Sequence, residues 1–262
     1  MAPELKYYDF DEYNNMITIL VGSPDKHLRQ TRVLAPVGLL SAQSGFFKAA
    51  CKIDWRTGRE MQIDLQHVKK EAFEIFMAWL NYSNIEQAKS WTEVKPRDLP
   101  SKRLDDRATQ WSTLCDCYIL ADSIIAPRFA NVIIDAMVTS LMRFEAEETS
   151  DSISPLCNKM VETIDLVWNT TPTQSPIRRL VMDSLTSTRH TNPEKTAKSF
   201  KKIGGSVKSE LVVPVEFMLD FIEHQGHTIK KRYSTEPWNI ASRNNRPCAY
   251  HIHDDGELCN KK

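Results

Sequence analysis

Four residues near the C-terminus, Cys248, His251, His253 and Cys259, are of the types that bind zinc in proteins. Zinc prefers four ligands in a tetrahedron, commonly thiolates and imidazoles. The two histidines are two residues apart, so on an extended segment both rings lie on the same side, and residues 254–256 can turn the chain back toward Cys259. This spacing predicts a structural zinc site, because a four-ligand set leaves no open position for a catalytic water. The alternative is a frayed tail in which these residues are incidental.

Other histidines and cysteines give weaker signals. His224 and His227 stand three residues apart near a predicted helix end, where contact with solvent or with the helix dipole is expected more than a metal site. Cys115 and Cys117 stand two apart within a helical pattern, so their side chains point to different sides and are expected to pack. The chain carries no nucleophile elbow, phosphate loop, dinucleotide fingerprint or zinc-protease helix. We therefore expect a protein that is not an enzyme.

The composition is that of an ordinary globular protein. Hydrophobic residues make up 41% of the 262 residues and charged residues 26%, and 34 basic residues balance 34 acidic ones. A neutral chain has no overall attraction to nucleic acid or to acidic membranes. The first residues lack the basic start and the apolar core of a signal peptide, and no apolar run reaches the roughly 18 residues that span a bilayer. The expected location is the cytoplasm or the nucleus.

Two short basic clusters support an alternative function. They consist of Lys195, Lys198, Lys201 and Lys202, and of Lys230, Lys231 and Arg232. Close positive charges attract phosphates or nuclear import receptors. The second hypothesis is therefore a nuclear regulatory factor that binds nucleic acid or chromatin through these clusters and a zinc-stabilised tail. The usual role of such clusters is a solvated loop, and the tail lacks the spacing that places a recognition helix.

Three short strands are predicted in the first quarter of the chain. Residues 16–21 are apolar, rich in β-favouring types, and end at a Gly-Ser-Pro turn. Residues 33–37 can form the hairpin partner, although Pro36 shortens this strand or confines it to an edge. Apolar and polar residues alternate at 61–65, which predicts a third strand with one buried face.

Helices are predicted for most of the remainder. A Ser-rich segment predicts a short helix with Ser41 or Ser44 near its start. Apolar spacing predicts helices at residues 71–82, 111–119 and 127–141, the last opened by Pro127. Residues 85–107 are polar and are predicted to be an exposed insertion. The aromatic residues expected in the core are Phe46, Phe47, Phe73, Phe76 and Trp79.

The second half of the chain is predicted to be a helical extension. One helix is indicated by apolar residues that recur every four positions, Leu156, Met160, Ile164 and Trp168. Ser175 and Pro176 supply the cap and first turn of a second helix. A last helix opens at Pro214 and ends at Gly226. Its apolar face is predicted to consist of Val215, Met218, Phe221 and Ile222.

The order of these elements, strands first and helices later, indicates the α+β class. The predicted parts are an N-terminal tail (residues 1–15), a first domain (16–144), a helical extension (145–226) with a hinge at 145–155 and a mobile loop at 186–210, and a C-terminal tail (227–262).

Three segments of the first half resemble the BTB/POZ family. They are LLSAQSGFFKAAC at 39–51, EAFEIFMAWLNYSNI at 71–85 and ILADSIIAPRFANVIIDAM at 119–137. Their features are a Leu-Leu pair, a Ser before two aromatics, a Phe-Glu helix that ends in Trp, Leu and Tyr, and a closing helix pair. Residues 164–185 are similar to a segment of BTB proteins of filamentous fungi. The resemblance implies a BTB/POZ fold, a small three-stranded sheet flanked by helices.

What the resemblance implies about function is an oligomerising protein-interaction module. Such a module acts as a scaffold or adaptor, in some members as a substrate adaptor for cullin-type ubiquitin ligases, so the expected partners are proteins and second copies of the chain. Two departures are residues 35–37, Ala-Pro-Val where many members have Val-His-Lys, and residues 55–57, Trp-Arg-Thr where cullin-binding members carry an aromatic, any residue and Glu. The missing carboxylate removes a polar contact, which makes the cullin role less expected than interaction in general.

Trp55, Arg56 and Thr57 are the predicted interface residues. Trp55 lies between the charged residues Asp54 and Arg56, and no apolar periodicity surrounds it. Contact with a partner chain and simple packing at an edge both remain open for this side chain.

Overall fold

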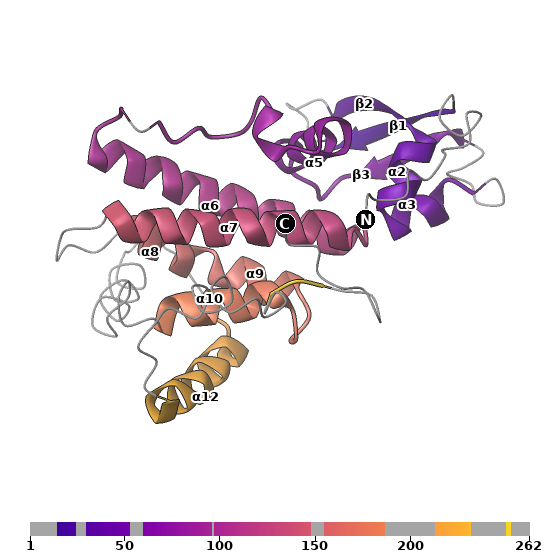
Figure 1. Ribbon diagram of the computed structural model, residues 1–262. Helices are drawn as coiled ribbons and strands as arrows, with labels where there is room; N and C mark the ends of the chain where they lie inside the picture. Colours follow the sequence, from indigo (N-terminus) through magenta and orange to yellow (C-terminus); the bar gives the residue numbers. More distant parts are fainter. Residues whose placement is uncertain are drawn as a thin grey trace, which may run out of the picture. The chain divides into compact units, whose positions relative to one another are not determined.

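The computed structural model describes residues 15–24, 30–52, 60–95, 97–147, 155–186, 213–231 and 250–252. These residues form a mixed α and β structure with one small three-stranded sheet and a mostly helical remainder (Figure 1). The predicted α+β class is confirmed at this level.

The sheet consists of β1 (Met16–Val21), β2 (Thr31–Pro36) and β3 (Gln62–Leu65) in the order β2-β1-β3. β2 pairs antiparallel with β1, and β3 pairs parallel with it. The register places Thr18 opposite Leu34 on one side and Gln62 on the other. Ile17 and Ile19 are fully buried between less buried neighbours, so one face of the sheet packs on the core. All three predicted strands are confirmed, as is the edge position of β2 among the described strands.

Four helical segments follow in the first unit: α2 (Val37–Gln43), α3 (Gly45–Ala50), α5 (Lys70–Tyr82) and the 3-10 helix η1 (Ile85–Gln87). The predicted short helix is thus two helices separated by Ser44. The Ser44 side chain accepts a hydrogen bond from the N–H of Phe47 at 3.1 Å and so caps α3, whereas Ser41 lies within α2. The predicted helix at 71–82 is confirmed.

The prediction of an exposed insertion at residues 85–107 is wrong in part. Ile85 and Arg107 are buried, and η1 packs against α5. Helix α6 (Pro100–Ser123) begins inside this region. The first two turns of α6 have no apolar period. They are helical because they extend a helix that buried residues further along, such as Trp111, stabilise. Pattern alone therefore missed them.

Helix α7 (Pro127–Glu147) begins at the predicted proline and extends beyond the predicted end at 141. Proline is well suited to the first position of a helix, because its fixed φ fits and its missing N–H has no partner there.

The described residues of the second half form α8 (Pro155–Glu162), α9 (Ile164–Thr170), α10 (Pro176–Thr186) and α12 (Val215–Lys231). Pro176 opens α10 as predicted. The single helix predicted through residues 156–168 is broken at Thr163, whose Oγ1 accepts a hydrogen bond from Trp111 Nε1 at 3.3 Å. The Oγ of Ser175, the predicted cap, lies 3.2 Å from the hydroxyl of Tyr118.

Two predictions for α12 are wrong. The helix continues through Gly226 to Lys231. Of the predicted apolar face, Val215, Met218 and Ile222 are exposed, whereas Phe217 on the opposite side is fully buried. The helix has apolar residues on two sides, and its contacts with α9 and α10 decide which side is buried.

The chain divides into two compact units, Met1–Trp91 with Leu120–Phe129, and Thr92–Ile119 with Ala130–Lys262. Helices α6 and α7 each contribute residues to both units, so the units do not follow the predicted boundary between residues 144 and 145. The first domain predicted at residues 16–144 stays a prediction.

Several predictions fall on residues outside the described ones. They concern most of the N-terminal tail, residues 148–154 of the hinge, residues 187–210 of the loop with the lysine cluster at 195–202, and most of the C-terminal tail. Of the predicted hinge, residues 145–147 are the end of α7 and Pro155 begins α8. Among the helices that the described ranges contain, none is both long and apolar enough to cross a membrane.

Candidate interaction site

Three segments separated in sequence meet in the core of the first unit. The Ser44 hydroxyl donates a hydrogen bond to the carbonyl of Ile124 at 2.5 Å. The ring of Phe47 stacks on Phe76 with centroids 6.4 Å apart, and Phe76 meets the edge of Phe129 at 5.2 Å. Of the predicted core aromatics, Phe47, Phe73 and Phe76 are buried and the other two are half-buried, namely Phe46 and Trp79. Residues from 39–51, 71–85 and 120–129 therefore contribute to the core of the first unit.

The edge strand β2 directs backbone groups away from the sheet. The N–H of Thr18 bonds the carbonyl of Met61 at 3.0 Å, so the backbone groups of Thr18 point toward β3. Leu34 lies opposite Thr18. In an antiparallel ladder, every second pair of opposite residues shares no hydrogen bond, and the two residues turn their N–H and C=O groups away from each other. The N–H and C=O of Leu34 therefore point away from β1, and the same parity applies to Arg32.

A groove of about 280 Å³ lies beside this strand. Its lining is mostly apolar, with polar groups among it, and comprises Val33, Phe73, Glu74, Met77, Ala78, Asn81, Tyr82, Gln87, Ala88 and Lys89. Val33 belongs to β2, and most of the other residues belong to α5. An extended peptide paired with an edge strand points every second side chain to one side. The strand and the groove together thus offer both backbone partners and an apolar surface.

No match to this chain came from protein-family models or from the curated proteins. The BTB/POZ resemblance accordingly stays a prediction. What the described residues do show is an edge strand beside a mostly apolar groove.

The turn between α6 and α7 holds an exposed residue in a strained conformation. Ile125 is 62% exposed and has a φ of 53°, in the left-handed region that β-branched residues avoid. Its carbonyl accepts a hydrogen bond from the N–H of Gly45 at 2.9 Å. A Cβ added at Gly45 would lie 3.0 Å from Cγ2 and 3.2 Å from Cβ of Ile125, so the Ile125 side chain would have to shift by a few tenths of an ångström.

The predicted interface residues Trp55, Arg56 and Thr57 lie outside the described residues. Their role stays a prediction. Just before them, Cys51 ends α3 as a half-buried residue. Burial raises the pKa of its thiol, an effect that a hydrogen bond with Ser41 partly offsets, so this thiol is a poor nucleophile near neutral pH.

Of the four predicted zinc ligands, only His251 is among the described residues; Cys248, His253 and Cys259 lie outside them. The His251 ring is well buried, and its Nε2 lies 3.0 Å from Asp135 Oδ1 on α7. The side-chain amide of Asn131, one turn earlier, bonds both the carbonyl of Ile252 (2.8 Å) and its N–H (2.7 Å). Residues 251 and 252 are thus fastened to α7 by three polar contacts.

The structure brings no further metal ligands together within its described part. There, no group of three or more His, Cys, Asp or Glu side chains is placed to hold an ion. Cys115 and Cys117 are fully buried, in agreement with the packing role predicted for them. Burial raises the pKa of the Cys117 thiol well above its usual value.

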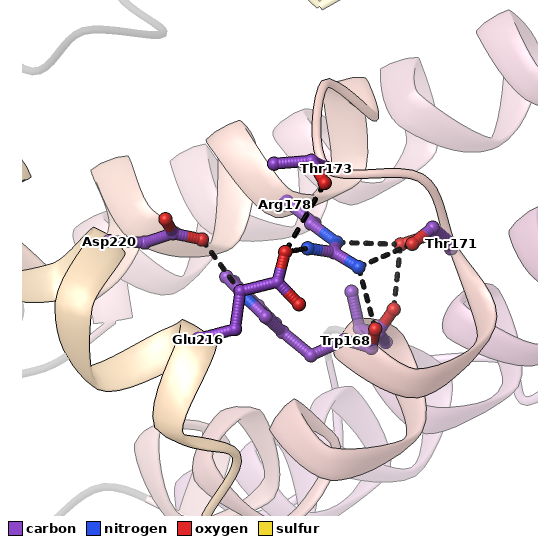
Figure 2. Close-up of polar contacts among 7 residues, drawn as sticks. Trp168, Thr171, Thr173, Arg178, Glu216 and Asp220 are labelled. Carbon is purple, nitrogen blue, oxygen red and sulfur yellow. Dashed lines mark hydrogen bonds and ion pairs between the residues drawn. The ribbon is translucent and has the colours of Figure 1, made fainter.

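A buried arginine that the sequence did not reveal organises the second unit (Figure 2). The Arg178 guanidinium donates to Glu216 Oε1 at 2.8 Å, to Thr171 Oγ1 at 3.2 Å and to the carbonyls of Trp168 and Thr171. It also lies over the Trp168 ring, 5.3 Å from the centroid. Thr173 donates to the same Glu216 oxygen at 3.2 Å. One side chain on α10 thereby connects the α9–α10 turn to the first turn of α12.

A second polar cluster centres on the buried carboxylate of Asp183. Its oxygens lie 2.5 Å from the Tyr250 hydroxyl and 2.8 Å from His224 Nε2, and Arg179 covers the Tyr250 ring at 5.6 Å. The expectation that His224 contacts solvent or a helix end is wrong, because α12 continues beyond it and its ring binds Asp183. The side chain of His227 is not among those described.

Proposed function

We propose that this chain is a protein-interaction module without enzymatic activity, and that its first unit binds an extended segment of a partner protein. The observation that carries the proposal is the pairing of an outward-facing strand edge at Arg32 and Leu34 with the adjacent apolar groove. Backbone hydrogen bonds supply affinity in this mode of recognition, and the groove selects apolar side chains.

The resemblance to the BTB/POZ family supports the same class of function. The segments that carry it contribute to one core, and a three-stranded sheet flanked by helices is compatible with the family fold. On this proposal the chain is a scaffold or adaptor that self-associates, and adaptor activity for a cullin-type ligase is one specific form of it. The residues proposed to contact such a partner remain Trp55, Arg56 and Thr57.

A structural zinc ion held by Cys248, His251, His253 and Cys259 is part of the proposal for the tail. His251 fits this role, because its Nε2 already faces a carboxylate and its Nδ1 is the remaining ring nitrogen that can bind a metal. A carboxylate partner of this kind fixes the orientation of a metal-bound imidazole in many zinc sites.

Selection of peptides from a displayed random library against the full chain tests the binding proposal. We expect extended peptides with an apolar residue, whose affinity for Leu34→Pro falls about tenfold or more, because proline removes the outward N–H. Leu34→Ala keeps that N–H and is the matched control, with little expected loss. Met77→Lys places a charge in the groove and should also weaken binding. Peptides that bind all three variants like the unchanged chain would contradict the proposal.

A further inference from the structure

The outer edge of β2 offers backbone hydrogen bonds over a short stretch. The N–H and C=O groups of Arg32 and Leu34 face outward from the sheet. Pro36, the next residue of the same parity, has no N–H to donate. A partner strand therefore bonds Arg32 and Leu34, and its residue between these two bonds lies opposite Val33.

The two faces of β2 differ in chemistry, because side chains alternate between them along the strand. Val33 lines the groove, whereas Arg32 and Leu34 are exposed on the other face, Leu34 to 63%. The partner residue opposite Val33 thus points to the groove side, where an apolar side chain gains most from burial. The partner residue opposite Arg32 lies on the exposed face.

Arg32 is the charge that a partner strand meets on this exposed face. No ion pair joins Arg32 to a carboxylate in the described part of the chain. Asp64 lies on the same face but two strands away, roughly 10 Å at the usual strand spacing, and its two oxygens accept hydrogen bonds from two glutamine side chains at 2.9 Å. A residue directly opposite Arg32 would lie about 5.5 Å away between the Cα atoms, within the screening length of about 8 Å. The groove itself carries one carboxylate, Glu74, and one ammonium, Lys89, so Arg32 determines which charge is preferred.

We propose that the partner segment runs antiparallel to β2 and carries an apolar residue followed directly by Asp or Glu. The antiparallel direction is favoured because antiparallel pairs are slightly more stable per residue than parallel ones. In this direction the partner passes Leu34 first, then Val33 and then Arg32, so the apolar residue precedes the acidic one. This inference rests on the proposed function and adds to it the sequence that the partner must have.

Charge reversal at Arg32 tests the inference. Peptides selected from the displayed library against the full chain should contain the apolar-acidic pair. In fluorescence anisotropy, the unchanged chain should bind a selected peptide with Glu at the acidic position about fivefold tighter than the same peptide with Lys there. Arg32→Glu should reverse this preference, and Arg32→Gln should bind both peptides alike. Arg143→Glu, at an exposed arginine of α7 in the second unit, makes the same change of net charge and should keep the preference for Glu.

The outcomes separate this inference from the proposed function. Peptides whose binding Leu34→Pro weakens, but whose acidic preference is absent or unchanged in Arg32→Glu, would overturn the inference and leave the proposed function intact. Enrichment of the acidic residue before the apolar one would also overturn it, because the partner would then run parallel to β2. If Leu34→Pro binds every selected peptide like the unchanged chain, the proposed function fails, and this inference fails with it.

Discussion

At the scale of single residues, Ser44 shows how one side chain can join distant parts of a chain. Its hydroxyl accepts from Phe47 at the start of α3 and donates to the carbonyl of Ile124, 80 residues away in sequence. The Ser44 hydroxyl and the Ile124 carbonyl are buried and hydrogen-bonded to each other, and a buried polar group without a hydrogen bond would be costly. The serine that the sequence predicts as a helix cap is therefore also a tertiary contact.

Replacing Ser44 tests this double role. Ser44→Ala should lower the free energy of unfolding by about 1–2 kcal/mol, because it removes the cap and one of the two donors to the Ile124 carbonyl, the other being the N–H of Phe46. Ser41→Ala, inside α2, is the comparison and should cost less, since alanine favours a helix interior. Urea denaturation of both variants measures the difference, and equal losses would refute the assignment.

Asp122 is expected to make stability depend on pH. Burial raises the pKa of its carboxyl. The contribution of Asp122 to stability is therefore fully present below the pKa of the unfolded chain, about 4, and is lost as the pH rises through the higher pKa of the folded state. Asp122→Asn does not titrate, so the variant should gain stability relative to the unchanged chain between acidic and neutral pH. Thermal unfolding of both proteins over this range measures the gain, and parallel curves would argue against it.

The proposed zinc site makes a prediction for Asp135. Purified full-length chain should contain about one zinc per molecule. Loss of the carboxylate in Asp135→Ala should weaken zinc binding about 10- to 100-fold, since His251 loses the partner that orients it. Asp105→Ala, at another acidic position on a helix, serves as the control. Metal analysis after dialysis against a graded chelator gives the comparison, and absence of stoichiometric zinc in the unchanged chain would end the hypothesis.

At the scale of elements, the attachment of α12 depends on a few strong contacts. Arg178 is almost fully buried and donates four hydrogen bonds to groups on α9, the following turn and α12. A guanidinium can serve all of these at once because its donors form a rigid planar fork. The position of α12 follows from this contact together with the burial of Phe217.

Arg178→Leu should detach α12 locally. The variant leaves the carbonyls of Trp168 and Thr171 without donors, which should cost about 2–4 kcal/mol of unfolding free energy. Arg178→Lys should rescue only part of this loss, because a single ammonium cannot reproduce the fork. Hydrogen exchange should show faster exchange in residues 217–223. Unchanged protection of this helix in Arg178→Leu would contradict the role assigned to the arginine.

At the scale of the whole molecule, the chain consists of two compact units that share helices α6 and α7. Proteins open locally in cooperative regions that follow such packing units. Ser44→Ala should therefore speed hydrogen exchange mainly in β1, β2, α3 and α5, whereas Arg178→Leu should do so mainly in α9, α10 and α12. Exchange that rises equally in both units for either variant would show that the chain opens as one region.

Much of the candidate site could not be predicted because its contacts join residues far apart in sequence. Arg178 and Glu216 are 38 residues apart, and Tyr250 and Asp183 are 67 apart. Nothing in the local pattern around Arg178 distinguishes it from neighbouring Arg179, which is exposed. The groove beside β2 likewise exists only because the edge strand and α5 lie next to each other in space. The spacing of apolar residues predicts each of these elements but not which elements are neighbours.

The sequence by itself determined the three strands, the helix at 71–82 and the helix starts at Pro127 and Pro176, because alternation, helical period and proline geometry act between near neighbours. Tertiary structure alone decided three features: the break at Thr163, the helices formed within residues 85–107, and the side of α12 that is buried. In each of these places local preferences are weak or divided, as in α12 with apolar residues on two sides. There the free energy of packing against a distant partner, such as Trp168 on Phe217, determines which conformation is stable.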